Sequence, residues 1–384
     1  MESTSTAPII EHFTAVTDPR IQKKIKHKLI DIITISICAS ICGANDWVSV
    51  EQYGKAKLDW FKSFLELRNG IPSHDTFGRI FSVLQIDEIE SCFLSWIQTV
   101  STMTAGQVVA IDGKTLRGSY DTANSKAALH LVSAWASESG VTLGQVKTEE
   151  KSNEITAIPE LLDLLEIPGC IVTIDAMGCQ KDIAEKIIDK NADYVLALKG
   201  NQKNLYEDVQ KYFDEYLKNS FQNLPIETMT TVDGDHGRIE TRNYYLTSDI
   251  NWLQGKENWK GLKSIGMVIS ETDKGGSIST HTRYYINSIG TVGEQSIQQF
   301  SNAVRKHWGI ENNVHWVLDV AFREDGSRMR KGNSAAIFSI LRHVALNLLN
   351  KEKTLKVGTN TKRLKAGWDN QYLFKVLKSG LKNS

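Results

Sequence analysis

Four side chains that can bind a metal ion or a phosphate recur every four residues in the segment HWGIENNVHWVLD. They are His307, Glu311, His315 and Asp319. If this segment is helical, the spacing stacks all four side chains along one face. The histidines are also compatible with hydrogen-bonded core positions. The HExxH spacing of a zinc site is absent, so the carboxylates favour a hard cation. Glu311 is the residue of this segment that we predict to bind it.

Two further carboxylates follow short runs of β-branched and apolar residues. Asp112 follows VVAI and Asp175 follows IVTI, which predicts that each lies at the C-terminal end of a buried strand, where open α/β sheets place ligands. One aspartate in such a position is more often a turn former or a helix cap. Two on neighbouring strands would repel each other unless cations lay between them, and carboxylate oxygens suit Mg²⁺ or Mn²⁺. With Glu311, they predict a metal site for phosphoryl transfer on nucleic acid.

Basic residues near these carboxylates in the sequence are candidates for holding a phosphodiester backbone. Each of them alone is more often a solvated surface residue. We expect His307, one turn before Glu311, to touch the scissile phosphate or to orient the metal-bound carboxylate. Asp319 is expected farther from the metal ions, paired with an arginine such as Arg323. The candidates for DNA contact are Lys114, Arg117, His236, Arg238, Arg305, His307 and Arg328.

The elements that must position these residues change in character along the chain. Residues 1–105 have helical periodicity and predict a helical N-terminal domain, with Ser73 and Asp87 as helix N-caps. Its short helix after Pro72 is compatible with a helix-turn-helix, although a plain packing helix is the commoner case. Residues 106–350 are predicted to form one mixed α/β catalytic domain, in which residues from about 220 to 290 form a β-rich insertion of hairpins.

The composition is that of an ordinary soluble protein. The chain has 384 residues with 45 basic and 45 acidic side chains, which excludes a globally basic nucleic-acid binder but not a local basic surface. Residues 351–384 carry nine Lys or Arg and two acidic residues, and predict a basic tail that either tracks phosphates or is merely solvated. Five scattered cysteines indicate reduced core thiols. Neither a signal peptide nor a membrane span is expected, so a cytoplasmic location is predicted.

With these residues located, the sequence resembles the DDE transposases of bacterial insertion sequences, specifically the H-repeat-associated (ISAs-type) group. The motifs that carry this resemblance are HFTAVTDPR, AIDGKTLRGS, TIDAMGCQKDIAEKI, DHGRIETR and RKHWGIENNVHWVLDVAFREDGSR. The resemblance implies a ribonuclease H-like catalytic domain, a catalytic triad of Asp112, Asp175 and Glu311, and a Mg²⁺ or Mn²⁺ cofactor. It also implies DNA as the partner, a homodimer in the DNA complex and association with the bacterial nucleoid.

One family signature is degenerate in this chain. The broader superfamily carries Tyr, Arg, Glu and Lys around the last carboxylate, but here the places around Glu311 hold Val304, His307 and Leu318. The phosphate-holding roles of that signature therefore do not transfer to these positions. Two alternatives to an active transposase remain open, namely a catalytically silent DNA-binding relic and a structure-selective nuclease that never joins strands.

Overall fold

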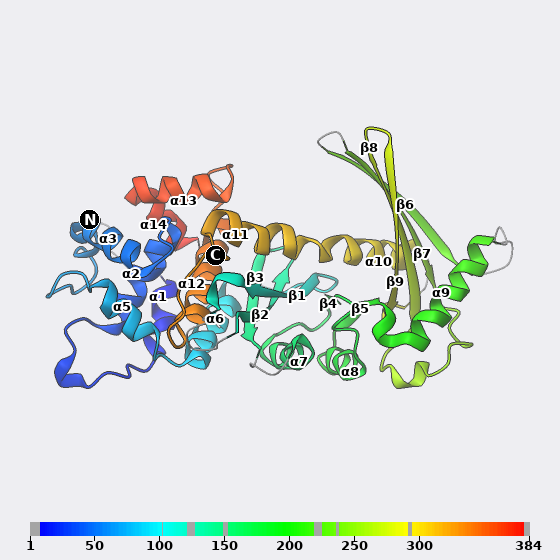
Figure 1. Ribbon diagram of the computed structural model, residues 1–384, viewed down its shortest axis with the longest axis horizontal. Helices are drawn as coiled ribbons and strands as arrows, with labels where there is room; N and C mark the ends of the chain where they lie inside the picture. The colour runs from blue at the N-terminus through cyan, green and yellow to red at the C-terminus, as the bar shows by residue number, and fades with distance from the viewer. Residues whose placement is uncertain are drawn as a thin grey trace. The chain divides into compact units, whose positions relative to one another are not determined.

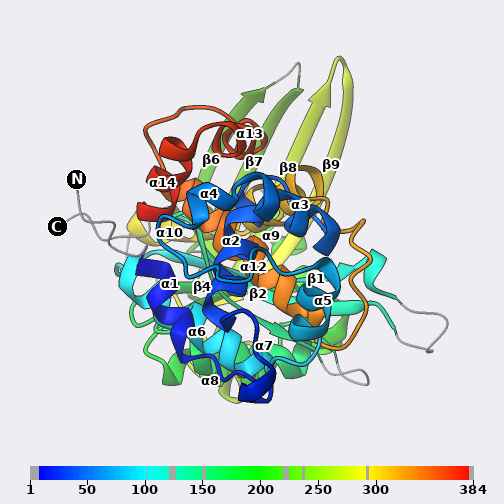
Figure 2. The same ribbon diagram turned by 90° about the vertical axis from the view of Figure 1, so that its left-hand side faces the viewer.

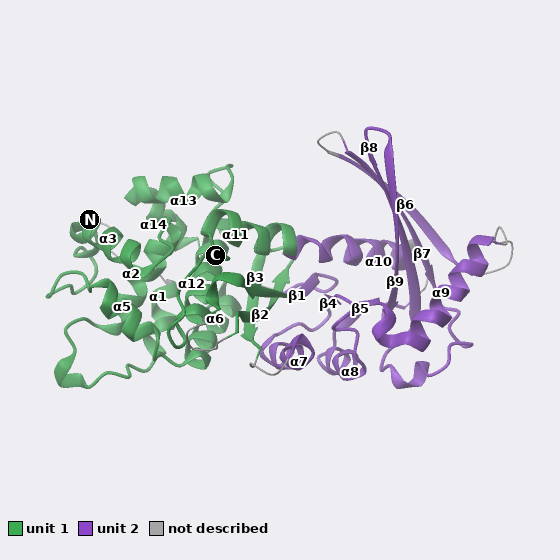
Figure 3. Ribbon diagram, in the orientation of Figure 1, with its two compact units in different colours: residues 1–102, 113–151, 311–384 green, residues 103–112, 152–310 purple. Residues whose placement is uncertain are grey.

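The computed structural model describes residues 8–101, 103–120, 127–148, 153–218, 225–235, 238–290 and 294–379. Its contacts divide the chain into two compact units (Figure 3). Unit 1 comprises residues 1–102, 113–151 and 311–384, and unit 2 comprises residues 103–112 and 152–310. Each unit is therefore assembled from segments that are far apart in the sequence.

The described residues form one mixed sheet with the strand order β3-β2-β1-β4-β5-β9-β8-β7-β6. The strands are β1 (Val108–Leu116), β2 (Leu129–Ala136), β3 (Val141–Lys147), β4 (Ile171–Ile174), β5 (Asp193–Leu198), β6 (Glu227–Asp235), β7 (Arg238–Thr247), β8 (Ser264–Lys274) and β9 (Ser277–Asn287). The helices of unit 2 are α7 (Glu154–Leu164), α8 (Lys181–Asp189), α9 (Lys203–Lys218) and α10 (Glu294–His307).

Parallel and antiparallel strands are both present in unit 2. The apolar runs that were predicted as buried strands pair in parallel, β1 with β4 and β4 with β5. Strand β9 returns antiparallel to β5, so the hairpins β6–β7 and β8–β9 extend the same sheet. Helix α10 lies over one face of these strands, and α7 and α8 lie over the other (Figure 1). This arrangement confirms the predicted ribonuclease H-like α/β class with a β-rich insertion.

Helix α10 is seated closely on the extended sheet. Phe300 is fully buried among residues of several strands, and it lies against Gly266 of β8. A Cβ at position 266 would lie 2.4 Å from Cζ of Phe300, so only glycine allows this approach. The close packing fixes the helix that leads toward Glu311.

Unit 1 is mostly helical. Its helices are α1 (Pro8–His12), α2 (Leu29–Ile41), α3 (Trp47–Ala56), α4 (Leu58–Phe61), α5 (His74–Phe81), α6 (Ile86–Val100), α11 (Trp316–Phe322), α12 (Ser334–Lys351), α13 (Thr359–Trp368) and α14 (Asn370–Lys378). Helix α12 contacts α2, α5 and α6 and is the central helix in Figure 2. Ser73 caps α5 as predicted, through a bond from the Thr76 amide. The Asp87 prediction is wrong, because α6 begins at Ile86 after Gln85.

The basic C-terminal segment is folded within unit 1 rather than extended as a tail. It forms α13 and α14, and the inner face of α14 buries Tyr372, Leu373 and Val376. Two of its cations are buried, because Lys362 donates to the carbonyl of Leu349 and Arg363 to that of Ser40. The apolar face of α14 is the physical reason that the segment folds, and the burial of Lys362 and Arg363 removes these two cations from any phosphate contact.

Two smaller predictions concern the thiols and the membrane. Cys38, Cys92, Cys170 and Cys179 are buried and Cys42 is half-buried, and all five are free, as predicted. Within the described ranges, no helix has the length and apolar character that crossing a membrane requires.

Candidate metal centre

Asp112 and Asp175 follow directly aligned residues on adjacent parallel strands. In the register of β1 with β4, Ile111 is the partner of Ile174, so each aspartate directly follows one residue of this aligned pair. Asp175 follows the end of β4, as predicted. The prediction that Asp112 ends its strand is wrong, because β1 continues to Leu116. That extension is held by burial of Leu116 in a cluster with Leu129, Leu131 and Ala336.

The Asp175 carboxylate organises the turn that follows β4. Its Oδ1 accepts hydrogen bonds from the amides of Met177, at 3.0 Å, and Gly178, at 3.3 Å. A Cβ at position 178 would lie 2.2 Å from Cγ2 of Ile174, so glycine is required where the turn passes over the strand. Asp175 thus has the turn-forming role of an isolated aspartate, whatever else it does.

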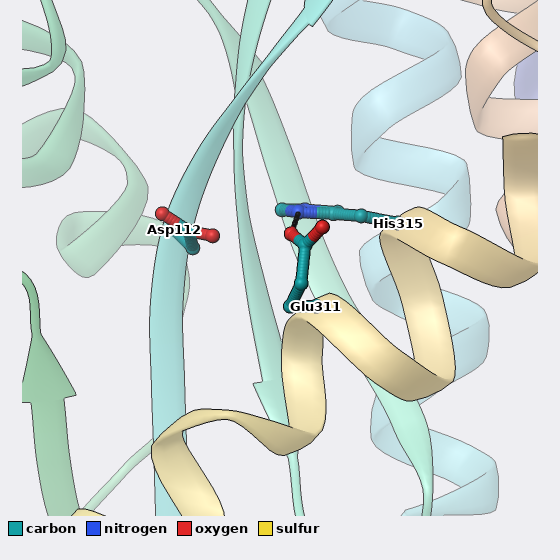
Figure 4. Close-up of side chains that lie close together, drawn as sticks. All are labelled: Asp112, Glu311 and His315. Carbon is teal, nitrogen blue, oxygen red and sulfur yellow. Dashed lines mark hydrogen bonds and ion pairs between the residues drawn. The ribbon is translucent and has the colours of Figure 1, made fainter. Parts of the chain in front are cut away.

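Glu311 and His315 lie on a π-helical turn, η7 (Glu311–His315), between α10 and α11. The Nδ1 atom of His315 lies 3.1 Å from Oε2 of Glu311, and Figure 4 shows the Glu311 carboxylate beside the His315 ring, with Asp112 of β1 to the left of both. Each of the three residues offers one ligand atom, and these atoms lie within 4.8 Å of one another. Asp175 is not part of this group. Turns of π-helix are frequent at functional sites.

The exposure of these residues suits a binding site that opens to solvent. The Glu311 side chain is 56% exposed, whereas that of His315 is 5% exposed. Burial lowers the pKa of His315, and the nearby Lys114 lowers it further, although Glu311 opposes both effects. The imidazole is therefore neutral near pH 7, with one nitrogen that donates and one that accepts. Two carboxylates and a neutral imidazole are a donor set that fits a divalent cation.

Within unit 1, Lys114 holds the π-helical turn in place through hydrogen bonds and ion pairs. Its ammonium group, on a side chain that is 11% exposed, donates to Oδ1 of Asp319 at 2.5 Å and to Oε2 of Glu324 at 3.0 Å. It also donates to the carbonyl oxygen of His315 at 3.2 Å. These contacts argue against the predicted phosphate contact of Lys114. They also correct the expected partner of Asp319, which is Lys114 and not Arg323.

Glu324 is the buried anchor of this network. Its side chain is 1% exposed, and its Oε1 accepts from the Ser339 hydroxyl at 2.9 Å and lies 3.5 Å from Arg342. Burial alone would raise the pKa of Glu324, but Lys114, Arg342 and His343 outweigh it and lower the pKa to about 2. The sequence pattern did not single out Glu324, because a buried carboxylate in a loop leaves no periodic signal.

His307 is separated from the other members of the predicted stripe. Helix α10 ends at His307, and the following turn of π-helix breaks the 3.6-residue period that the four-residue spacing assumed. In unit 2, Nδ1 of His307 lies 3.0 Å from the Thr173 hydroxyl of β4. Burial lowers the pKa of His307 to about 4, so the ring is neutral. The contact with Thr173 joins the end of α10 to the strand that precedes Asp175.

The remaining candidates for DNA contact are scattered over both units. Arg117 is 85% exposed and lies 3.6 Å from Asp325, and Arg305 lies 3.2 Å from Asp233. Arg238 pairs with Glu240 at 2.5 Å. Arg328 is exposed in the loop between α11 and α12, and His236 lies outside the described residues. Sequence reasoning placed His315 on the four-residue stripe but left it out of the predicted metal ligands, although its four-residue distance from Glu311 was the signal that could have included it.

Comparison with known proteins adds a second line of observation. The family described as Transposase DDE domain matches residues 104–348, and the family described as DDE_Tnp_1-associated matches residues 10–97. The chain is 44% identical over 376 residues to "Putative transposase YncI" of Escherichia coli O157:H7, covering 97% of this chain and 94% of that protein. It is 41% identical over 377 residues to "H repeat-associated putative transposase YhhI" of Escherichia coli K12, covering 96% and 97%.

A solved structure is also similar at the level of the whole chain. It is a piggyBac transposase synaptic complex with hairpin DNA, which shares 12% sequence identity with this chain at a TM-score of 0.46. The match covers 97% of this chain and 78% of that chain.

Proposed function

Because the chain belongs to the DDE transposase family, we propose that it cleaves DNA at the ends of a mobile element and transfers the strands, with Mg²⁺ or Mn²⁺ as cofactor. The proposed catalytic carboxylates are Asp112, Asp175 and Glu311. The observation that carries the proposal is the group of ligand atoms from Asp112, Glu311 and His315 within 4.8 Å of one another. The alignment of Ile111 with Ile174 supports Asp175 as the third carboxylate.

In this proposal the three carboxylates would hold the cation, which when bound supplies Lewis-acid stabilisation of the attacking and leaving oxygens. His315 donates its Nδ1 hydrogen to Glu311 and fixes the orientation of that carboxylate, as a ring bonded to a metal ligand commonly does. Lys114 holds the backbone of the same turn through the His315 carbonyl. No covalent bond between protein and DNA is required.

The proposed partners follow from the reaction. Strand transfer of an element requires two ends to be brought together, and we propose that two protomers act on them as a homodimer on DNA. Among the predicted phosphate contacts, Arg117 is 85% exposed, and the exposed Arg328 has no ion pair with the residues that the structure describes. The partly buried Lys114 and His307 are assigned positioning roles instead.

The experiment compares Asp112→Asn, Asp175→Asn and Glu311→Gln with the unaltered protein on DNA that carries the termini flanking its coding region. Each substitution removes a ligand charge and keeps the shape, so cleavage with Mg²⁺ or Mn²⁺ is expected to fall to background. Glu166→Gln is the matched control, because Glu166 is an exposed carboxylate of unit 2 outside the candidate site. Circular dichroism and thermal unfolding verify that every variant is folded.

The outcomes separate the proposal from its alternatives. Cleavage by a variant at the rate of the unaltered protein removes that residue from the catalytic set. Cleavage without joining of the 3′ ends identifies a nuclease. Binding of the termini with no cleavage by the unaltered protein identifies a relic.

A further inference from the structure

A cleft in unit 1 is lined by cations that the metal centre does not use. Its volume is ≈ 1130 Å³, and its walls are the start of α3, the helix α5 and the loop of residues 323–333 between α11 and α12. In Figure 2 this loop runs beside α3 and α5. Five Lys or Arg residues line the cleft against two aspartates, so its walls are net positive.

Four of these cations have no carboxylate partner among the residues that the structure describes. Arg79, on α5, and Arg323, Arg328 and Lys331, on the loop, are exposed and form no ion pair there. The fifth, Arg330, is engaged: it donates to the carbonyl of Gly118 and lies over the Tyr120 ring. The four unpaired charges are therefore available to a ligand at no cost in broken salt bridges.

Of the two aspartates in the cleft, Asp46 accepts a hydrogen bond at the start of a helix and Asp75 is exposed to solvent. Asp46 accepts from the Ser49 amide at 2.7 Å and so caps α3. Asp75 has a side chain that is 79% exposed, 3.7 Å from the ring of His74. Neither of them neutralises the arginines across the cleft.

The loop is held in place by its inward-facing residues, so its cations do not depend on a ligand for their position. Glu324 is tied to Lys114 and Arg342, and Met329 is buried. Asn333 donates from its backbone amide to the carbonyl of Ser82 and from its side chain to that of Leu84. Anchored and exposed residues alternate along the loop. Arg323, Arg328 and Lys331 therefore line the cleft from a loop whose position is held by its buried contacts.

We propose that this cleft binds the phosphodiester backbone of duplex DNA, separately from the metal centre. The cleft is larger than a single phosphate needs, and its unpaired cations come from both walls, as contact with successive phosphates requires. Five Lys or Arg residues and four glycines are among its lining residues, and glycines leave the backbone open to the close approach of a phosphate. The proposal rests on the proposed function for the identity of the polyanion, and it adds the surface that holds it.

The test measures affinity for a short fluorescent DNA duplex of arbitrary sequence at several salt concentrations, in EDTA, so that no cleavage occurs. The double variant Arg328→Gln with Lys331→Gln is compared with Lys23→Gln with Lys24→Gln, which removes the same charge from exposed positions elsewhere in unit 1. The slope of log affinity against log salt is expected to fall by about 1.8 in the cleft variant, since each lost phosphate contact contributes about 0.9. The control is expected to keep the full slope.

Four results would overturn the proposal. They are failure of the unaltered protein to bind the duplex, an unchanged slope in the cleft variant, an equal fall in the control, and equal competition by polyglutamate, which would assign the cleft to an acidic protein. Adding Arg79→Gln tests the opposite wall and is expected to lower the slope again. Because binding is measured without metal, a protein that binds through the cleft but never cleaves would contradict the proposed function and leave this inference standing.

Discussion

Glu311 and Glu324 lie thirteen residues apart in unit 1 and are used in opposite ways. Glu324 is 1% exposed and is compensated by Lys114, Arg342 and the Ser339 hydroxyl. The side chain of Glu311 is 56% exposed, and its carboxylate contacts the neutral ring of His315. The carboxylate of Glu324 is thus paired with two cationic side chains. The carboxylate of Glu311 is not paired with a cationic side chain in these contacts, and it can still bind a cation. A carboxylate whose charge the fold has already balanced is structural, and one whose charge is left unbalanced is a candidate ligand.

The two regions are linked by Lys114. It contributes one hydrogen bond to the backbone of the π-helical turn, at His315, and two ion pairs to the carboxylates of Asp319 and Glu324. A buried charge must be paired because its desolvation otherwise costs several kcal/mol. The network therefore stabilises the turn that carries Glu311 without touching the carboxylate itself.

The largest effect on stability is expected from Lys114→Met, which keeps the length of the side chain and removes its charge. Glu324 and Asp319 would lose their shared cation, and breaking a buried pair in this way costs about 3–5 kcal/mol. The free energy of unfolding in urea, followed by tryptophan fluorescence, measures the loss. Arg117→Gln is the matched control, because Arg117 is 85% exposed three residues later, and such a surface change stays within about 0.5 kcal/mol.

Equal losses of stability for Lys114→Met and Arg117→Gln would contradict the assignment of Glu324 as a carboxylate that depends on Lys114. A loss below about 1 kcal/mol for Lys114→Met would mean that Glu324 is satisfied without it, and the assignment of Lys114 to a positioning role would fail.

Sequence reasoning reached the strands and the carboxylates for physical reasons that are local. VVAI and IVTI are uninterrupted apolar runs, which a buried parallel strand requires, and the aspartates follow each of them directly. The four-residue spacing from Glu311 to His315 likewise brought two side chains together, as the 3.1 Å contact shows. These features depend only on residues that are neighbours along the chain.

The same reasoning could not foresee contacts that are made by distant segments of the chain. Lys114 stands near Asp112 in sequence and was expected at a phosphate, but Asp319 and Glu324 arrive from some two hundred residues away and bury it. His307 shares the spacing of the stripe, yet the π-helical turn breaks its phase and Thr173 takes its hydrogen bond. The basic C-terminal segment was expected as a tail because charge was counted, while its buried apolar face decided the fold.

A second effect on stability, intermediate in size, is expected from protonation of His343, which lies near Glu324. Burial lowers the pKa of His343 from 6.5 to about 4, so the unfolded chain binds this proton more readily than the folded one between those pH values. Stability from the neutral ring is complete above pH 6.5 and is lost as the pH falls toward 4, by up to about 3 kcal/mol. Glu324, with its pKa lowered to about 2, loses its contribution only at lower pH, as the pH falls from about 4.5 to 2.

The variant His343→Gln isolates this proton, because an amide can keep the hydrogen bond that the ring shares with the Thr142 hydroxyl. The decline in free energy of unfolding between pH 6.5 and 4 is expected to be shallower in this variant. The same substitution at the exposed His281 is expected to leave the decline unchanged. Identical pH profiles for His343→Gln and the unaltered protein would show that the region around Glu324 tolerates an added positive charge.

The smallest effect is expected from Asp319→Asn, and it decides on which side of the comparison Asp319 belongs. Its side chain is 33% exposed, and its partner Lys114 keeps Glu324, so loss of one partly solvated charge costs about 1 kcal/mol or less. If Asp319 acts only through this network, the variant keeps metal-dependent cleavage and shows a slightly lower midpoint of urea unfolding. A stable but inactive Asp319→Asn variant would place Asp319 with Glu311 among the residues that serve the metal centre, and exposure would then no longer separate the two kinds of carboxylate.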